Sequence, residues 1–241
     1  MYQDVLTQIN ESQMILVGIG NELSCYHGID WNVEKEFSDW KEIFLTNEES
    51  SQNEIQGFYK ILSDILNGKN YFIITTNVDD LIYESGLKPE RIVAPCGSKN
   101  RLQCRCEGED GLIKTPKQYY DAASACICEK CGYAYEPNIY NKNYYNENGY
   151  LKQWHLYNKW LQGTLNRKLT ILELGCDFSF MSLIRLPFEK IALINQKSFY
   201  YRINGHFPQI TGELKEKMKS VFCTPQEFFK KFKGSREIQE L

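Results

Sequence analysis

Five short apolar runs, rich in Ile, Val and Leu, recur along the chain and have the length of buried strands. They are MILVGIG (14–20), YFIITTN (71–77), RIVAP (91–95), LTILELG (169–175) and KIALIN (190–195). Their apolar positions are nearly continuous instead of alternating, as is typical of parallel strands covered by helices on both faces. The pattern predicts an α/β fold built on a Rossmann-like parallel sheet.

Between these runs, apolar residues recur with the period of an α-helix. The segments NEIQGFYKILSDIL (53–66) and LKQWHLYNKWLQ (151–162) each place their large apolar residues on one face. A third helix is expected after Thr224, because Pro225 suits a first helical turn and Glu227 completes a capping box with Thr224. Strands and helices therefore alternate over most of the chain.

The alternation breaks between about residues 97 and 150, where five cysteines precede the Tyr- and Asn-rich run YAYEPNIYNKNYYNENGY. We interpret this stretch as an inserted small domain. The predicted division is a Rossmann-like domain formed by residues 1–96 and 165–241, and a small zinc-binding and helical domain formed by residues 97–164.

The charge and composition of the chain limit the classes of partner that we expect it to bind. The 241 residues carry 28 Lys and Arg against 31 Asp and Glu, a net charge of -3, so nothing in the overall charge favours nucleic acid or anionic lipid. The first residues lack a basic region followed by an apolar core, and no run of about 18 apolar residues occurs. We expect a cytoplasmic protein with no membrane or nucleic-acid partner. Its nine cysteines then indicate metal binding or catalysis better than disulfides.

Five of the cysteines form two groups that could each give two thiolates to one tetrahedral zinc ion. Cys104 and Cys106 make the first group, and Cys126, Cys128 and Cys131 the second. In the sequence CEKCG, the glycine permits the positive backbone torsion that such a turn needs. We expect Cys104, Cys106, Cys128 and Cys131 to bind the metal, with Cys126 as the substitute. The alternative is a set of buried free cysteines that pack as small apolar residues.

Polar and glycine residues stand where the first two strands end. Gly18 and Gly20 could let backbone amides meet a pyrophosphate, although the third glycine of the dinucleotide fingerprint is missing and an ordinary strand-end turn explains them equally well. Asn77, Asp79 and Asp80 follow the second strand, at the sheet edge where such folds bind ligands. Capping of the next helix is the alternative for these side chains, and it is compatible with a functional role.

These features, in this order, resemble the sirtuins. TTNVDDL resembles their Gln-Asn-Ile-Asp box, CEKCGYAYEP their second zinc knuckle, LELGCDF their Gly-Thr-Ser strand end, and LIN the strand end that meets the adenosine ribose. The resemblance spans about residues 14–196, and LELGCDFSFMSLIRLPFEKIALIN is most similar to the bacterial class M sirtuins, whose members act as protein ADP-ribosyltransferases.

The resemblance implies a site for NAD and a role for each residue that matches the family. Asp79 would hold the nicotinamide carboxamide, and Asn77 would orient the ribose or a water. The first turn departs from the family, because Ile19 replaces a small Ala and Ser24 aligns only after an insertion. The implied NAD-binding residues are Gly18, Gly20, Ser24, Asn77, Asp79, Gly175, Cys176 and Asn195.

A second departure concerns the catalytic base. Deacylating sirtuins carry a His-Gly pair before the first zinc cysteines, whereas this chain has Cys96 followed by Gly97. Class M members also lack the His, so its loss argues against ordinary deacylation but not against NAD chemistry. The candidate catalytic residues are therefore Asn77, Asp79 and Cys96. Three roles remain open for Cys96: a nucleophile, an acceptor of ADP-ribose, or a small residue that fills space.

We therefore predict an NAD-dependent enzyme that releases nicotinamide and transfers ADP-ribose to a protein substrate, with zinc in a structural role. The alternatives are an NAD-dependent protein deacylase and an inactive module that binds NAD or ADP-ribose; a zinc ribbon for nucleic acid ranks last, because its cysteines lie among charges of both signs. Arg185 could meet a phosphate or pair with Glu189 on the surface. His27, His155 and His206 are expected to have ordinary packing or surface roles.

Overall fold

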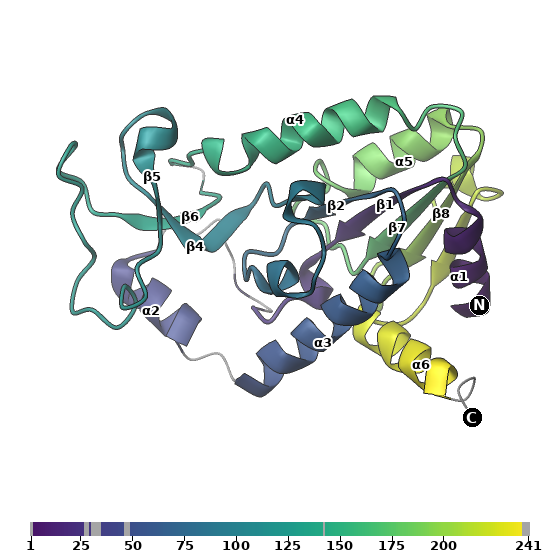
Figure 1. Ribbon diagram of the computed structural model, residues 1–241, viewed down its shortest axis with the longest axis horizontal. Helices are drawn as coiled ribbons and strands as arrows, with labels where there is room; N and C mark the ends of the chain where they lie inside the picture. Colours follow the sequence, from purple (N-terminus) through teal and green to yellow (C-terminus); the bar gives the residue numbers. More distant parts are fainter. Residues whose placement is uncertain (1, 27–28, 30–34, 46–48, 142, 238–241) are drawn as a thin grey trace.

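The computed structural model describes residues 2–26, 29, 35–45, 49–141 and 143–237. Its large sheet has six strands in the order β3-β2-β1-β7-β8-β9, and every neighbouring pair is parallel (Figure 1). The strands are β1 (Met14–Ile19), β2 (Tyr71–Thr75), β3 (Ile92–Val93), β7 (Leu169–Leu174), β8 (Ser198–Ile203) and β9 (Met218–Val221). The predicted parallel sheet is therefore confirmed.

Helices cover both faces of this sheet. One face carries α1 (Tyr2–Glu11), α3 (Glu49–Leu66) and α6 (Pro225–Glu237), and the other carries α4 (Asn148–Gln162) and α5 (Arg185–Ile194). The remaining helix, α2 (Phe37–Leu45), lies beside the small sheet described below, where Phe44 contacts Tyr120 (Figure 1). Figure 1 shows α4 and α5 above the strands and α3 and α6 below them. None of the described helices combines the length and hydrophobicity needed to cross a bilayer.

The two-sided cover explains why the strand runs are continuously apolar. In β1, Ile15, Val17 and Ile19 belong to the hydrophobic cluster under α3, whereas Met14 and Leu16 belong to the cluster under α4 and α5. Side chains alternate between the two faces of a strand, so each face needs its own apolar set.

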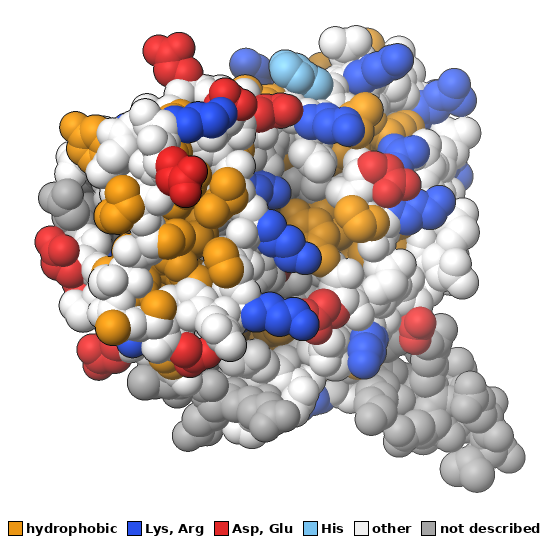
Figure 2. Space-filling model, turned by 60° about the vertical axis from the view of Figure 1, so that its left-hand side comes forward, with side chains coloured by type: hydrophobic (Ala, Val, Ile, Leu, Met, Phe, Trp, Pro, Cys, Tyr) orange, Lys and Arg blue, Asp and Glu red, His pale blue; other side chains and the backbone are white. Residues whose placement is uncertain are grey.

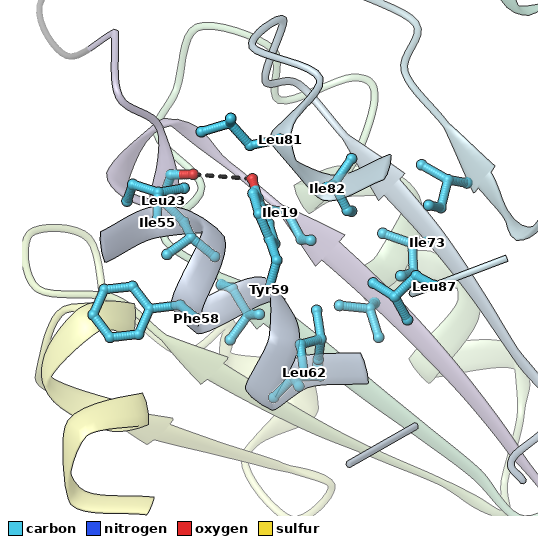
Figure 3. Close-up of a cluster of buried hydrophobic side chains, with 14 of the residues drawn as sticks. Ile19, Leu23, Ile55, Phe58, Tyr59, Leu62, Ile73, Leu81, Ile82 and Leu87 are labelled. Carbon is cyan, nitrogen blue, oxygen red and sulfur yellow. Dashed lines mark hydrogen bonds between the residues drawn. The ribbon is translucent and has the colours of Figure 1, made fainter. Parts of the chain in front are cut away.

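The cluster under α3 is centred on aromatic and aliphatic side chains from the helix. Figure 3 shows Tyr59 and Leu62 of α3 on the side of Ile19 and Ile73, with Tyr59 reaching towards Leu23, whereas Phe58 points the other way and stacks on Phe229 of α6. The Tyr59 side chain is fully buried. This packing places α3 directly beneath the segment that follows β1.

One predicted strand is wrong. Residues 190–195 belong to α5, and the strand beside β7 is β8, which begins at Ser198. Phe188 and Ala192, four residues apart, are both fully buried, while Ile194 is 58% exposed, which is the period of a helix. A run of six apolar residues is compatible with either structure, and the spacing of the flanking residues decides between them.

The three predicted helices are present. The segments 53–66 and 151–162 lie within α3 and α4, which begin a few residues earlier than expected. The capping box of α6 is also confirmed, because the Thr224 N–H donates to Glu227 Oε2 at 2.9 Å and the Glu227 N–H donates to Thr224 Oγ1 at 3.3 Å.

A second, antiparallel sheet interrupts the parallel one. It consists of β4 (Gly97–Gln103) between β5 (Leu112–Lys114) and β6 (Glu136–Ile139). The helix α4 then returns to the large sheet, where the Trp160 Nε1–H donates to Asn70 Oδ1 at 2.7 Å. The domain boundaries at 96 and 164 remain predictions, since α4 contacts the large sheet directly.

Candidate active site and metal centre

The chain reverses its direction of travel across the large sheet between β1 and β7. From β1 it continues outward to β2 and β3, and from β7 outward to β8 and β9. In open α/β sheets, ligands bind outside the carboxyl ends of the strands at such a switch point. The candidate site therefore lies where β1 and β7 end.

Close contacts with side chains at Gly18 and with backbone at Gly20 explain why both positions are glycine. A Cβ on Gly20 would lie 2.3 Å from Cys176 Cα, and the Gly20 N–H already donates to the Leu174 carbonyl at 2.8 Å. A Cβ on Gly18 would lie 2.4 Å from Ile184 Cγ2. Both glycines are thus required by internal packing, the alternative that the sequence left open, whether or not a pyrophosphate lies nearby.

Gly175 ends β7 in a left-handed conformation. Its φ is +62°, and an added Cβ would lie 2.4 Å from the Cβ of Glu22. Its N–H donates to the Ile203 carbonyl at 2.8 Å, and its carbonyl accepts the Glu22 N–H at 3.1 Å. The ends of β7 and β8 therefore contact the short 3-10 helix Asn21–Leu23 that follows β1.

Asn77 joins the end of β2 to the segment that follows β1. Its Nδ2 donates to the Leu23 carbonyl at 2.6 Å and lies 3.1 Å from the Tyr59 hydroxyl. The Tyr59 hydroxyl donates to the same carbonyl at 3.1 Å, as drawn in Figure 3. Asn77 is buried, so these contacts hold its amide in one orientation.

Asp79 lies beside Asn77 and is only 1% exposed. Its Oδ1 accepts the Leu81 N–H at 3.0 Å, and its Oδ2 lies 3.5 Å from Ser24 Oγ and 3.8 Å from Cys25 Sγ. Burial raises the pKa of Asp79 to about 6, against the lowering effect of the Leu81 N–H. The structure thus brings Ser24, Asn77 and Asp79 together around a carboxyl group that changes protonation near neutral pH.

Cys96 is 2% exposed and belongs to the hydrophobic cluster under α3. Burial, reinforced by the charge of Asp177, raises the pKa of the Cys96 thiol well above its ordinary value. The neutral thiol is therefore the form present at neutral pH, and it is a poor base or nucleophile. This environment supports the space-filling role among the three that the sequence left open.

Asn195 does not join the other predicted site residues. It caps the carboxyl end of α5, and its Nδ2 donates to the carbonyls of Thr164 at 2.9 Å and Arg167 at 3.1 Å. Arg167 precedes β7, so Asn195 lies at the amino edge of the sheet, opposite the switch point.

Asn204 occupies the place expected of Asn195, directly after β8. It is fully buried, donates from Nδ2 to the Cys176 carbonyl at 2.8 Å, and accepts the N–H groups of His206 at 2.9 Å and Phe207 at 2.6 Å. The sequence contained a signal for it, because RIN at residues 202–204 repeats the LIN ending one apolar run later. A helix at residues 190–195 would have placed the next strand at the following apolar run, and Asn204 would then have been the Asn at its end.

Glu22 joins the segment that follows β1 to His206, which follows β8. Glu22 Oε1 lies 2.5 Å from Nδ1 of His206, and Glu22 Oε2 accepts the Gly205 N–H at 3.1 Å. His206 thus belongs to the same strand-end cluster, although its ring is exposed. His155 is exposed on α4, as expected, and His27 lies outside the described residues.

Arg185 is buried, and its predicted surface pair with Glu189 is wrong. The Arg185 Nη2 donates to the Phe207 carbonyl at 2.8 Å. Glu189 instead accepts a hydrogen bond from Nη2 of Arg202 at 2.7 Å, and Arg202 also pairs with Glu173 at 2.9 Å. Glu189 therefore pairs with Arg202 of β8 and not with Arg185, its neighbour on α5.

The four cysteines chosen from the sequence form one cluster. The Sγ atoms of Cys104, Cys106, Cys128 and Cys131 all lie within 4.8 Å of one another, and those of Cys106 and Cys128 are 3.8 Å apart. A tetrahedral zinc ion with Zn–S bonds of about 2.3 Å requires sulfur separations of about 3.8 Å. The cluster therefore fits a zinc ion, and the exposed Cys126 is outside it.

Turns hold these sulfur atoms together. The Cys128 N–H donates to the Tyr133 carbonyl at 2.8 Å, and Gly132 adopts the positive φ that the sequence predicted, +73°. Hydrogen bonds from the Tyr135 hydroxyl and then from the Cys131 backbone lower the pKa of Cys128, whereas burial raises the pKa values of Cys104 and Cys106. A thiolate, the form that binds metal, is thus favoured at Cys128.

Comparison with known proteins agrees with these features. No family profile matches the chain. A Staphylococcus aureus protein named Protein ADP-ribosyltransferase is 22% identical over 257 residues, which is 88% of this chain and 80% of that protein. Two solved structures each match over 99% of both chains: "The Structural basis for Sirtuin Substrate affinity", with 17% identity and a TM-score of 0.63, and "Sir2-p53 peptide-NAD+", with 18% identity and a TM-score of 0.62.

Proposed function

The chain has the sirtuin fold, and on that premise we propose that it is an NAD-dependent enzyme that releases nicotinamide and transfers ADP-ribose to a protein side chain. The likeness to the class M sirtuins is part of this proposal. One observation carries it: Ser24, Asn77 and Asp79 form a buried polar cluster at the switch point of the sheet.

The chemistry of the cluster suits the cleavage of a glycosidic bond. Asp79, with its pKa raised to about 6, is mostly ionised at pH 7 and can accept hydrogen bonds from the nicotinamide carboxamide. Asn77 can orient the ribose or a water, because Leu23 and Tyr59 hold its amide in place. An ionised Asp79 would also stabilise the positive charge that develops as the bond lengthens.

The strand ends supply the rest of the proposed site. We assign the adenosine half of NAD to Gly175, Cys176 and Asn204, which hydrogen bonds and packing already hold together. Gly18 and Gly20 serve by letting the loops approach closely. Asn195 has no part in this proposal, because it lies at the opposite edge of the sheet.

Zinc would be held by Cys104, Cys106, Cys128 and Cys131. Four thiolates leave the ion no open position, so its role would be to fold the small sheet and the loops around it.

The known proteins support the reaction class and the acceptor. One relative is named for protein ADP-ribosyl transfer, and one solved structure contains a peptide together with NAD. A protein substrate is therefore the acceptor that we propose. The buried, neutral thiol of Cys96 stands where deacylating sirtuins have their His, which disfavours the deacylase alternative.

The test is to incubate the zinc-loaded protein with NAD and candidate acceptor proteins, and to measure free nicotinamide and ADP-ribosylated protein by mass spectrometry. Asn77→Ala should lose the activity, whereas Asn53→Ala, at an exposed position of α3, should keep it. NAD binding without release of nicotinamide would favour the inactive module. Removal of acetyl groups from an acetylated peptide would favour the deacylase.

A further inference from the structure

A cavity of about 580 Å³ lies between the large and the small sheet. One wall is formed by the segment that follows β2 and by β3, the other by β4, β5 and the first turn of α4. Figure 2, in which the small sheet comes forward, shows a hollow on this face, with hydrophobic side chains in its depth and charged side chains of both signs around it. We call this space the inter-sheet cavity. Its volume is in the range of small-molecule sites, about 300–1,000 Å³.

Asp80 lies in the wall of the inter-sheet cavity in a strained conformation. Its φ is +62°, which is uncommon for a residue with a side chain, although Asp adopts it more readily than most. Its carboxylate accepts hydrogen bonds from the Ser98 hydroxyl and from the Asn100 N–H at 3.2 Å, so it joins the two walls. Asp79, one residue earlier, bonds to groups of the candidate active site instead.

The cavity wall carries two carboxylates, Asp80 and Glu84, and two cationic side chains, Arg101 and Lys114, which differ in how far they are engaged by other residues. Asp80 is already engaged, and Glu84 Oε2 accepts a hydrogen bond from Gln56 at 2.6 Å. Arg101 contributes Nη1 to the Gly149 carbonyl at 2.5 Å, which leaves its other guanidinium N–H groups for a ligand, and Lys114 is exposed. An anionic group fits this balance best.

The remainder of the lining is apolar and aromatic. Pro89, Ala94 and Ile113 supply aliphatic surface, and Tyr83 contributes an aromatic ring, whereas Ile92, which also lines the cavity, is fully buried. Such surface gains from contact with an apolar body and gains nothing from an inorganic ion.

We propose that the inter-sheet cavity is a second ligand site, separate from the cluster of Asn77 and Asp79, and that it binds a small organic anion with an apolar body. Lys114 and Arg101 bind the anionic group, and the apolar lining between β3 and β5 receives the body. This site requires neither NAD nor turnover, so it can be tested independently of the proposed function.

The test compares three probes on the zinc-loaded protein without NAD. Phenyl phosphate has both features, inorganic phosphate has only the anion, and benzyl alcohol has only the apolar ring. Titration followed by protein NMR should show saturable binding of phenyl phosphate at millimolar concentration or below, and at least tenfold weaker binding of the other two.

Variants locate the bound probe. Lys114→Gln should weaken phenyl phosphate binding by about two- to fivefold, as expected for one exposed charge, and Ile113→Trp should abolish it by filling the cavity. Lys117→Gln, the same change at an exposed lysine outside the lining, and Asp79→Asn should leave it unchanged. Absence of saturable binding, equal binding of benzyl alcohol, or loss of binding in Asp79→Asn with retention in Ile113→Trp would each overturn the proposal.

Discussion

The large sheet and the cysteine-containing region are stabilised by different means. The large sheet lies between two extensive hydrophobic clusters that draw on every helix. Among the described residues 97–147, the buried hydrophobic side chains other than cysteine are Leu102, Tyr119, Pro137 and Ile139. A region with so little apolar core needs another source of stability, which the four converging thiols can provide by binding a metal.

The large and the small sheet also differ in their buried polar contacts. The small sheet relies on a buried amide network, in which Gln103 Oε1 accepts hydrogen bonds from Asn138 Nδ2 at 2.7 Å and from the Asn146 N–H at 2.9 Å. At the switch point of the large sheet, the polar side chains are few and rest on the hydrophobic cluster beneath them. The proposed chemistry would therefore depend on the apolar core, whereas the wall of the inter-sheet cavity formed by β4 and β5 would depend on a bound metal.

The largest expected effect is therefore a loss of structure confined to the small sheet. Removal of the metal, or Cys131→Ser, should unfold the small sheet while the large sheet persists, because a structural zinc site contributes about 10–16 kcal/mol in small peptides. Hydrogen exchange should show rapid exchange of the amides of β4 and unchanged protection of β1 and β7. Cys126→Ser is the matched control and should retain full protection; equal protection of β4 in both variants would refute the proposed role of the metal.

A backbone contact at the switch point gives the next effect. Gly20→Ala should destabilise the fold by about 3 kcal/mol or more, since its Cβ would lie 2.3 Å from the Cys176 backbone. Gly57→Ala, inside α3 with no atom within 4 Å of the added Cβ, should instead stabilise it by about 0.5–1 kcal/mol. Urea denaturation measures both, and a Gly20→Ala protein as stable as the wild type would show that the two loops are not in contact.

Replacement of Asp79 should stabilise the fold, in contrast to Gly20→Ala, which should destabilise it. Its folded pKa of about 6 lies above the ordinary value of 3.8, so folding disfavours its ionised form. The penalty is absent below about pH 4, grows between pH 4 and 6, and is full above pH 6, where it amounts to at most about 3 kcal/mol. Asp79→Asn should therefore be more stable than the wild type at pH 8, with a difference that shrinks towards pH 5.

Thermal unfolding across that pH range measures the difference. Asp121→Asn, at an exposed position, should show no such trend. A constant difference at all pH values would mean that Asp79 is not the group that titrates.

The smallest effect concerns Asn77. Its removal in Asn77→Ala leaves the buried Leu23 carbonyl and Tyr59 hydroxyl with one partner fewer, which should cost about 1–2 kcal/mol. Asn53→Ala should cost far less. If urea denaturation gave equal stabilities, the amide would not be held as the structure shows, and its role in orienting a substrate would lose its basis.

The sequence predicted the parts that local pattern determines. Four of the strands, the zinc-compatible cysteines, and Asn77 with Asp79 followed from apolar runs, spacing and position after a strand. The strand at 190–195 failed because a short apolar run suits both a helix and a strand, and this error placed the expected adenosine contact at Asn195, whereas the structure leads us to propose Asn204. The contact between Glu22 and His206 spans 184 positions of sequence and has no local signal.

The most direct test of the account is calorimetric titration of NAD into the metal-loaded wild-type protein and Asn77→Ala. We expect saturable binding of one NAD per chain to the wild type, and clearly weaker binding to the variant. Absence of NAD binding to the wild type at millimolar concentration, with the small sheet intact by hydrogen exchange, would contradict the assignment of the switch point as an NAD site and leave only the fold.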